Sequence, residues 1–338
     1  MRNFKDYFFI FLKGMGMGAA DVVPGVSGGT IAFIAGIYEE LVDSIAAIKP
    51  SLWDDFKKEG FASVWQKING NFLIALLSGI AVSILSLAKI LTHAMQFYPI
   101  QLWAFFFGLI IASIWYVGKQ IKKWDFSVMA GIIIGTLAVL WLSITPPMGA
   151  NSSYLFLFFA GAIAACAMIL PGISGSFILL LLGAYATVIS AVGNQDIVTV
   201  AVVGLGAVTG LLSFSKLLKF LLEKYHNSLI AVLTGFLIGS LWKIWPWKKD
   251  EIIYVKELGP TNASTILGDY NSLSAYLKNA GVEEFNKYKA FIETNIPPHH
   301  YESINSGASA DILSAIIFSV FGFSVIFIIE YIAKLKNV

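Results

Sequence analysis

The feature that most constrains the fold is a Pro-Gly-x-Ser-Gly motif that occurs twice, each time inside a hydrophobic stretch. The surrounding segments, residues 14–45 and 161–192, align without a gap at an offset of 147 residues. The matching pairs that interrupt a helix or mark a turn are Pro24/Pro171, Gly25/Gly172, Ser27/Ser174, Gly28/Gly175, Gly36/Gly183 and Tyr38/Tyr185. Pro and Gly breaks at corresponding places in two hydrophobic segments indicate a site built from two broken membrane helices. The sequence therefore predicts an internal duplication with a paired membrane site, hinged at Pro24 and Pro171.

The composition places the chain among membrane proteins. Of its 338 residues, 57% are hydrophobic and 13% are charged, and the mean hydropathy is +0.75. Such a chain is too apolar for one soluble core, so we expect an all-α polytopic membrane protein. The net charge of +2 identifies no partner. We expect no nucleic acid partner and no cofactor. We also expect no metal, because the histidines and the single cysteine do not have the spacing of a metal site.

Six further hydrophobic stretches are each about long enough to cross a bilayer, which takes roughly 20 residues. They are residues 71–92, 101–118, 126–145, 198–218, 227–244 and 312–332. The duplication extends into these stretches, since residues 79–115 align without a gap with residues 206–242. We therefore expect about six full spans in two membrane repeats, over residues 1–145 and over 153–244 plus 312–333, with a polar insertion at 246–311.

The positions of the lysines give the expected topology. The motif segments, residues 7–45 and 153–192, each contain two short apolar runs, which suits a re-entrant hairpin that leaves the membrane on the side where it entered. The positive-inside rule then puts both termini and the Lys-rich connector 46–70 in the cytoplasm, and the insertion 246–311 outside. Three spans in each half make the second half inverted, so the hairpins meet from opposite faces, provided that neither hairpin crosses the membrane.

Within the insertion, apolar residues recur at helical spacing between residues 272 and 295. This spacing predicts an amphipathic helix there.

The motifs offer groups that can bind an anion without arginine, and the only arginine in the chain is Arg2. A helix that breaks and restarts leaves unpaired backbone amides that favour an anion, and glycine lets a ligand approach them. The candidate phosphate-binding residues are Gly25, Ser27, Gly28, Gly29, Thr30, Gly172, Ser174, Gly175, Ser176, Lys89 and Lys216. The alternative is that Gly and Ser only permit close helix packing and self-capping, and that the lysines snorkel to the membrane surface.

Three carboxylates occur only in the first copy of the motif. Asp21 lies in an otherwise apolar stretch, where a charge is costly and marks a functional candidate, and the second copy has Met168 at this place. Glu39 and Glu40 follow Tyr38, where the second copy has uncharged residues. The alternative for the two glutamates is a simple position at the membrane interface.

Three strings of residues carry a resemblance to a known family: GAADVVPGVSGGTIAFIAGIYE, PGISGSFILLLLGAY and TGFLIGSLWKIWPW. They resemble the bacterial family of polyprenyl-phosphate (undecaprenyl-phosphate) transporters, PopT type, over most of the chain apart from residues 46–70 and 246–311. The resemblance implies a multi-pass protein of the bacterial cytoplasmic membrane. It also implies transport of undecaprenyl phosphate from the outer to the inner leaflet, for reuse in peptidoglycan and other envelope polymers. The residues by themselves indicate only a transporter that handles an anion.

The electrical work of such transport points to proton coupling. A phosphomonoester carries roughly −1.5 to −2 charges, and moving one charge across 100 mV costs about 2.3 kcal/mol. We therefore expect Asp21, with Glu39 or Glu40, to carry compensating protons. Two alternatives remain. One is a phosphatase acting on undecaprenyl pyrophosphate, which the absence of arginine and of a Ser-His pair from the motifs disfavours. The other is a carrier or channel for a small soluble anion.

Overall fold

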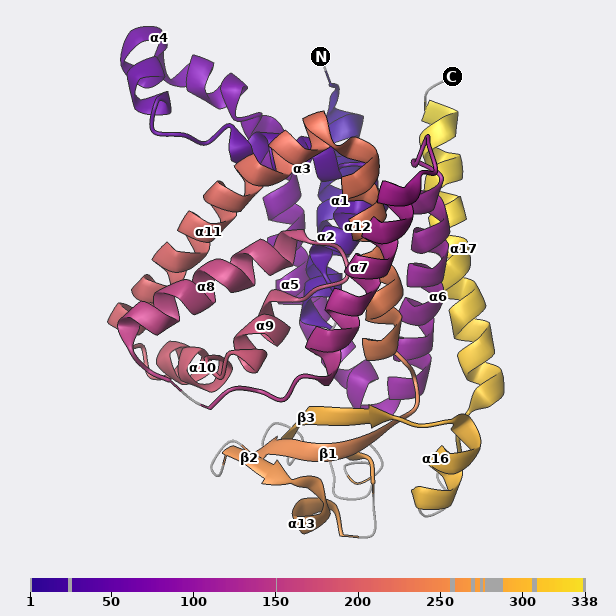
Figure 1. The fold of residues 1–338 in the computed structure, drawn as a ribbon. Helices are drawn as coiled ribbons and strands as arrows, with labels where there is room; N and C mark the ends of the chain where they lie inside the picture. Colours follow the sequence, from indigo (N-terminus) through magenta and orange to yellow (C-terminus); the bar gives the residue numbers. More distant parts are fainter. Residues whose placement is uncertain are drawn as a thin grey trace. The chain divides into compact units, whose positions relative to one another are not determined.

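The computed structural model describes residues 2–23, 26–149, 151–255, 259–268, 271–273, 276, 288–305 and 309–336 (Figure 1). The chain forms two compact units. Unit 1 consists of Met1–Ala88 and Ile114–Ser240, and unit 2 consists of Lys89–Ser113 and Leu241–Val338. Both motifs lie in unit 1, so the site is built within that unit.

The described part of unit 1 is helical. It contains α1 (Phe4–Val22), α2 (Gly28–Ile34), α3 (Tyr38–Ala46), α4 (Leu52–Lys67), α7 (Phe126–Ile144), α8 (Tyr154–Ile169), α9 (Gly175–Leu181), α10 (Tyr185–Gly193) and α11 (Ile197–Lys224). Three helices are divided between the units: α5 (Gly70–Phe97), α6 (Pro99–Gly118) and α12 (His226–Lys243).

Both motifs fold into the same series of elements. Residues 23–27 separate α1 from α2, and residues 170–174 separate α8 from α9. Each break is followed by a helix of seven residues and then by a helix of nine residues. Pro171 lies in the second break, whereas Pro24 and Gly25 lie outside the described residues. A helix break thus occurs at both copies of the motif.

Glycine makes the turn between the two short helices in each copy. Gly36 precedes α3 with φ of 67°, and Gly183 precedes α10 with φ of 69°. A residue with a side chain is strained in this backbone conformation, which glycine adopts freely. The second turn bends α9 against α10 by 111°.

Four helices among the described residues are long and apolar enough to cross a membrane, judged by length and composition. They are Gly70–Leu87, Pro99–Gly118, Phe126–Ile144 and Ile197–Lys224, and α9 with α10 makes a fifth if the bent pair is one span. Two of the six expected spans do not meet this criterion. The helix α12 has the polar residues His226 and Lys243 at its ends. In α17 residues 312–328 are apolar, and the side chains of residues 329–336 lie outside the described residues, so the expected span 312–332 is not tested over its whole length. The protein is thus mostly helical, with four to five helices suited to a membrane.

The helices of unit 1 approach one another closely at glycines. A Cβ atom at Gly135 would collide with a backbone carbonyl of α12, and one at Gly235 with a backbone carbonyl of α7. Gly206 and Gly210 bring α11 equally close to carbonyl groups of α8. Small residues commonly allow such contacts between membrane helices.

Unit 2 corrects the all-α expectation, because the insertion contains a β-sheet. The strands β1 (Lys248–Val255), β2 (Gly259–Asn262) and β3 (Tyr288–Asn295) are antiparallel, in the order β2-β1-β3. The branched and aromatic residues at the end of β1 favour a strand. The expected amphipathic helix over 272–295 is wrong for 288–295, which form β3, and residues 274, 275 and 277–287 lie outside the described residues. Helical spacing of apolar residues does not reveal a backbone partner some forty positions away.

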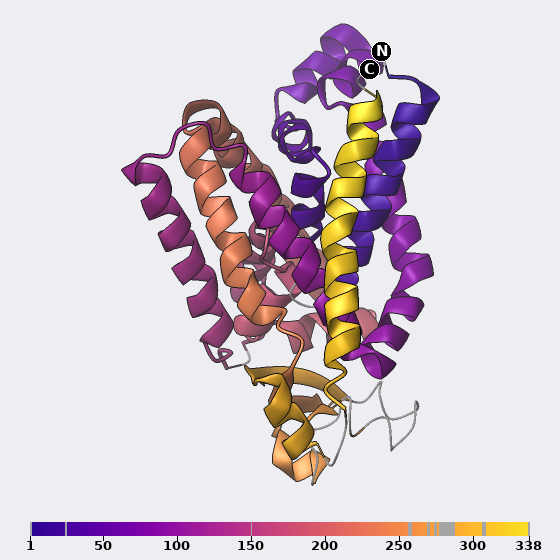
Figure 2. The ribbon, with the colours of Figure 1, turned by 90° about the vertical axis from the view of Figure 1, so that its right-hand side faces the viewer.

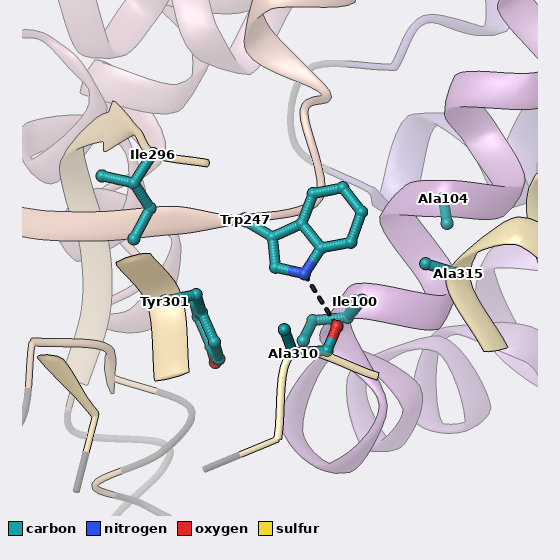
Figure 3. Packing of buried hydrophobic residues seen from close by; sticks show 7 residues of the cluster. All are labelled: Ile100, Ala104, Trp247, Ile296, Tyr301, Ala310 and Ala315. Carbon is teal, nitrogen blue, oxygen red and sulfur yellow. Dashed lines mark hydrogen bonds between the residues drawn. The ribbon is translucent and has the colours of Figure 1, made fainter. Parts of the chain in front are cut away.

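A small hydrophobic core joins the insertion to two long helices of unit 2. The Trp247 indole N–H donates to the Ala310 carbonyl at 2.8 Å, beside Ile100 of α6 and Tyr301 of α16 (Pro298–Ile304) (Figure 3). Ala315 of α17 (Ile312–Lys336) belongs to the same cluster. Figure 2 shows α17, in yellow, running away from the sheet. Within unit 2, the insertion and the long helices therefore share one hydrophobic core.

Buried charges add to this core. Lys243 and Lys248 each donate to Glu293 Oε2 at 3.2 Å, and the Lys248 ammonium group lies 4.1 Å from the centre of the Trp103 ring. Burial opposes ionisation of Glu293, but the two ammonium groups outweigh it and lower the pKa of this carboxyl to about 2. The pairs connect β1 and β3 to the end of α12.

Candidate functional site

The two helix breaks are hydrogen-bonded to each other. The Ser27 hydroxyl donates to the carbonyl oxygens of Met168 at 3.0 Å and Leu170 at 3.3 Å. The backbone N–H of Gly172 donates to the Thr30 hydroxyl at 2.9 Å. The side chains of Ser27 and Thr30 are fully buried. Two segments far apart in the sequence therefore form one structure, as a paired site requires.

Glycine allows this contact at Gly29. A Cβ atom there would lie 2.9 Å from the Met168 carbonyl oxygen and closer still to that of Ile169. The Gly29 backbone N–H donates to the Ser27 hydroxyl at 3.1 Å, so Ser27 also caps α2. These contacts are the close packing and self-capping that the sequence left as the alternative to anion binding. In the first copy, Ser27, Gly29 and Thr30 are already engaged with protein groups.

Asp21 occupies a further donor of the first copy. The backbone N–H of Gly28 donates to Asp21 Oδ1 at 2.7 Å, and a Cβ atom at Gly28 would collide with this carboxylate. Asp21 lies in the last turn of α1 and is partly buried. A hydrogen bond to a charged acceptor is stronger than one between neutral groups. The Asp21 carboxylate thus occupies the Gly28 amide, which the sequence predicts to bind a phosphate.

The second copy has its hydroxyl groups in a different setting. Ser174 is buried, Ser176 is exposed, and their hydroxyl oxygens are 2.9 Å apart. Unlike Ser27, Ser174 makes no side-chain cap on its helix. Gly175 is half-buried, and Gly172 has φ of 81°. The second copy therefore brings a hydroxyl pair to the edge of unit 1, without a carboxylate at the place of Asp21.

The lysines expected at the site are not both described. Lys216 lies on α11 with an exposed side chain, whereas the side chain of Lys89 lies outside the described residues. The sequence analysis overlooked Lys13, whose ammonium group donates to the Ala35 carbonyl at 2.6 Å, at the end of α2. A lysine inside the apolar run of α1 was the signal that could have drawn attention to it. Lys13 ties α1 to the first short helix.

The two glutamates after the first motif lie on α3 and bind basic or polar groups. Arg2 and Asn69 donate to Glu40, the latter at 2.7 Å, while Glu39 Oε1 lies 3.3 Å from His226 Nε2. The side chain of Glu39 is exposed by 61% and that of Glu40 by 25%. Glu39 thus lies at the surface of unit 1, whereas Glu40 is half-buried.

Tyr38 carries a buried hydroxyl without a hydrogen-bond partner among the described residues. Its ring packs against Phe33 at 4.8 Å between centres, and only 3% of the residue is exposed. Buried polar groups are nearly always paired, so an unpaired one calls for a water molecule or a ligand atom. The motif alignment singled out Tyr38, but only as a repeat position.

Comparisons with known proteins give the context of this site. Residues 17–261 match the sequence model of a family described as undecaprenyl phosphate translocase-like. A polyprenyl-phosphate transporter of Vibrio cholerae is 48% identical over 244 residues, which are 72% of this chain and 79% of that protein. A polyprenyl-phosphate transporter of Staphylococcus aureus is 32% identical over 272 residues, 75% of this chain and 90% of that protein. No solved structure matches the chain. The family match includes both motifs.

Proposed function

Because the chain belongs to the undecaprenyl phosphate translocase-like family, we propose that it carries undecaprenyl phosphate from the outer to the inner leaflet of the bacterial cytoplasmic membrane. This transport returns the lipid carrier for reuse in peptidoglycan and other envelope polymers. The names of the two relatives support a polyprenyl phosphate as the substrate. The observation that carries the proposal is the mutual hydrogen bonding of the two helix breaks.

The phosphate binds, in this proposal, by replacing hydrogen bonds that the backbone amides of the two breaks make to side chains, one of which joins the two copies. The amides of Gly28, Gly29 and Gly172 now donate to side-chain oxygens of the protein. Phosphate oxygens accept hydrogen bonds of the same kind and carry more charge. A phosphate would keep these amides paired while the breaks separate. The Asp21 carboxylate and the Thr30 hydroxyl each lose a donor in the exchange, so its cost is lowest when Asp21 is protonated.

The remaining candidate residues act at the edges of this site. The exposed hydroxyl of Ser176, with Ser174 and Gly175, provides the first contact of the second copy. Gly25 is the corresponding candidate contact in the first copy. Lys216, exposed on α11, attracts the anion. No arginine is required, because amides and hydroxyls supply the donors.

Asp21 couples the exchange to protons. As a carboxylate it holds the Gly28 amide and repels an approaching phosphate; once protonated it loses the charge and competes less well. A proton taken up with the substrate also offsets part of the electrical work, about 2.3 kcal/mol per charge and 100 mV. Glu39, at the surface, and half-buried Glu40 pass protons between Asp21 and water.

The proposed topology is an inverted repeat with two re-entrant hairpins. Both termini lie in the cytoplasm and the insertion 246–311 lies outside. In this arrangement the two breaks meet near the middle of the bilayer, and each copy of the motif faces one side. Alternating access then needs only a change in which side of the paired breaks is open.

The test is reconstitution of the full chain in liposomes with undecaprenyl phosphate, following both exposure of the lipid phosphate on each leaflet and release of free phosphate. The proposal expects translocation without release. A second set of liposomes contains undecaprenyl pyrophosphate, and release of phosphate from it without translocation of undecaprenyl phosphate would establish the phosphatase instead. Uptake of inorganic phosphate, with no movement of the lipid, would establish a carrier of a small anion.

A further inference from the structure

The helix α4 contributes no buried residue to the core of unit 1. Over Leu52–Lys67 no residue is buried, and Trp53, Phe56 and Phe61 are exposed by 62%, 44% and 63%. Figure 1 shows α4 projecting beyond the start of α5. A helix at the surface of a protein in water normally turns its apolar side chains towards a core. Three exposed aromatic residues on one unpacked helix therefore call for another apolar environment.

The aromatic side chains of α4 form two groups, one on each side of a kink. Gly60, with φ of 79°, divides the helix. Before it, the rings of Trp53 and Phe56 stack with centres 5.9 Å apart; after it, those of Phe61 and Trp65 lie 5.5 Å apart. Trp is enriched where a membrane meets water, because its ring is apolar and its N–H is polar. Each half of α4 thus carries residues suited to the membrane interface.

The position of α4 in the chain puts it at a membrane surface. Its last residue, Lys67, is separated by only two residues from Gly70, where the apolar helix α5 begins. Three steps along the chain reach at most about 11 Å, so Lys67 stays within about that distance of the start of α5. The Trp65 indole N–H donates to Asn71 at 2.9 Å, which fixes the end of α4 against the start of α5. The second half of α4 cannot reach far into water if α5 enters the bilayer.

The charges of α4 indicate what kind of surface it meets. Three lysines are balanced by Asp54, Asp55 and Glu59. Lys67 pairs with Asp55 at 3.0 Å and with Glu59 at 2.8 Å. A balanced helix gains little from anionic lipids, which attract an excess of Lys and Arg. The Lys57 ammonium group lies 5.2 Å from the centre of the Trp53 ring, so it can remain at headgroup level above an inserted ring.

We propose that α4 is an interfacial element that lies in the headgroup region of the membrane entered by α5, with Trp53, Phe56 and Phe61 inserted into it. The interaction rests on burial of aromatic surface and not on net charge. It depends on α5 being a membrane span and is independent of the substrate. It also anchors the first residues of α5, which directly follow α4.

The test uses the full chain in phosphatidylcholine liposomes, with Cys166→Ser and a fluorescent label on Ala62→Cys beside Phe61. Quenching by nitroxide-labelled lipid headgroups is compared with quenching by iodide in water. The matched control carries the same label with Trp53→Ser, Phe56→Ser and Phe61→Ser, which leave no cavity because none of these side chains is buried.

We expect strong quenching by the labelled lipid and weak quenching by iodide, with the ratio inverted severalfold by the three serine substitutions. Adding phosphatidylglycerol should leave both values unchanged. Equal iodide quenching in the two proteins would overturn the proposal. Protection that arises only with the anionic lipid would overturn the assignment to aromatic burial.

Discussion

The two copies of the motif fold into the same elements but differ in their polar groups. In the first copy, Ser27 and Thr30 are fully buried, and Asp21 holds the amide of Gly28. In the second copy, Ser176 is exposed and Met168 stands where the first has Asp21. The duplicated Gly and Pro residues shape the backbone, and substitutions after the duplication separate the chemistry of the copies. The hydroxyl groups of the first copy are buried in the contact between the copies, whereas the second copy has an exposed hydroxyl at Ser176.

The largest effect is expected at the contact between the copies. Gly29→Ala forces a methyl group against the carbonyl oxygens of Ile169 and Met168. Overpacking of this kind costs about 1–3 kcal/mol, and we expect it to abolish transport. Thermal unfolding in detergent and transport in liposomes measure the two effects. Gly204→Ala is the control, since nothing lies near a Cβ atom there. Equal behaviour of the two variants would show that the copies do not need to meet.

The second effect compares the hydroxyl groups of the two copies. Thr30→Val keeps the shape of the side chain but leaves the buried Gly172 amide without an acceptor, which costs about 1–3 kcal/mol. Ser174→Ala removes a hydroxyl that bonds to exposed Ser176, so we expect a loss below about 1 kcal/mol. Unfolding temperatures compare them directly. A larger loss for Ser174→Ala would reverse the roles of the two copies.

The third prediction concerns the buried hydroxyl of Tyr38. Tyr38→Phe removes a group without a described hydrogen-bond partner, so stability should stay the same or rise by up to about 1 kcal/mol. If the hydroxyl receives a substrate or water atom during the cycle, the transport rate falls while stability does not. Tyr154→Phe, at an exposed position of α8, should change neither quantity measurably. A marked loss of stability in Tyr38→Phe would mean that the hydroxyl has a partner in the folded protein.

The smallest effect is expected for the two glutamates of α3. Glu39→Gln and Glu40→Gln each break a pair at the surface, worth about 0–1 kcal/mol. Because they only relay protons in the proposed mechanism, each should slow gradient-driven transport less than a change at Asp21. Rates at several pH gradients measure this order. A complete loss of coupling in Glu39→Gln alone would move the coupling site from Asp21 to α3.

The sequence was most informative where two copies could be compared. The helix breaks and the contact between the motif copies follow from matched Pro, Gly and Ser residues. The partners of Ser27 and Thr30 did not follow, because the residue types at a break do not tell whether its hydroxyl and amide groups bind protein groups or a ligand. Lys13 was missed because the second copy has no counterpart that draws attention to it. The sheet of the insertion was missed because β1 and β3 have no equivalent elsewhere in the chain.

The most direct test of the account is Asp21→Asn in proteoliposomes with and without an imposed pH gradient. The asparagine oxygen can still accept from the Gly28 amide, so the fold should persist while the ionisable group is lost. Asp43→Asn, an exposed acid of α3, is the matched control. We predict that Asp21→Asn moves undecaprenyl phosphate without any response to the pH gradient, while Asp43→Asn responds as the unaltered protein does. Unchanged gradient-driven transport in Asp21→Asn would contradict the account.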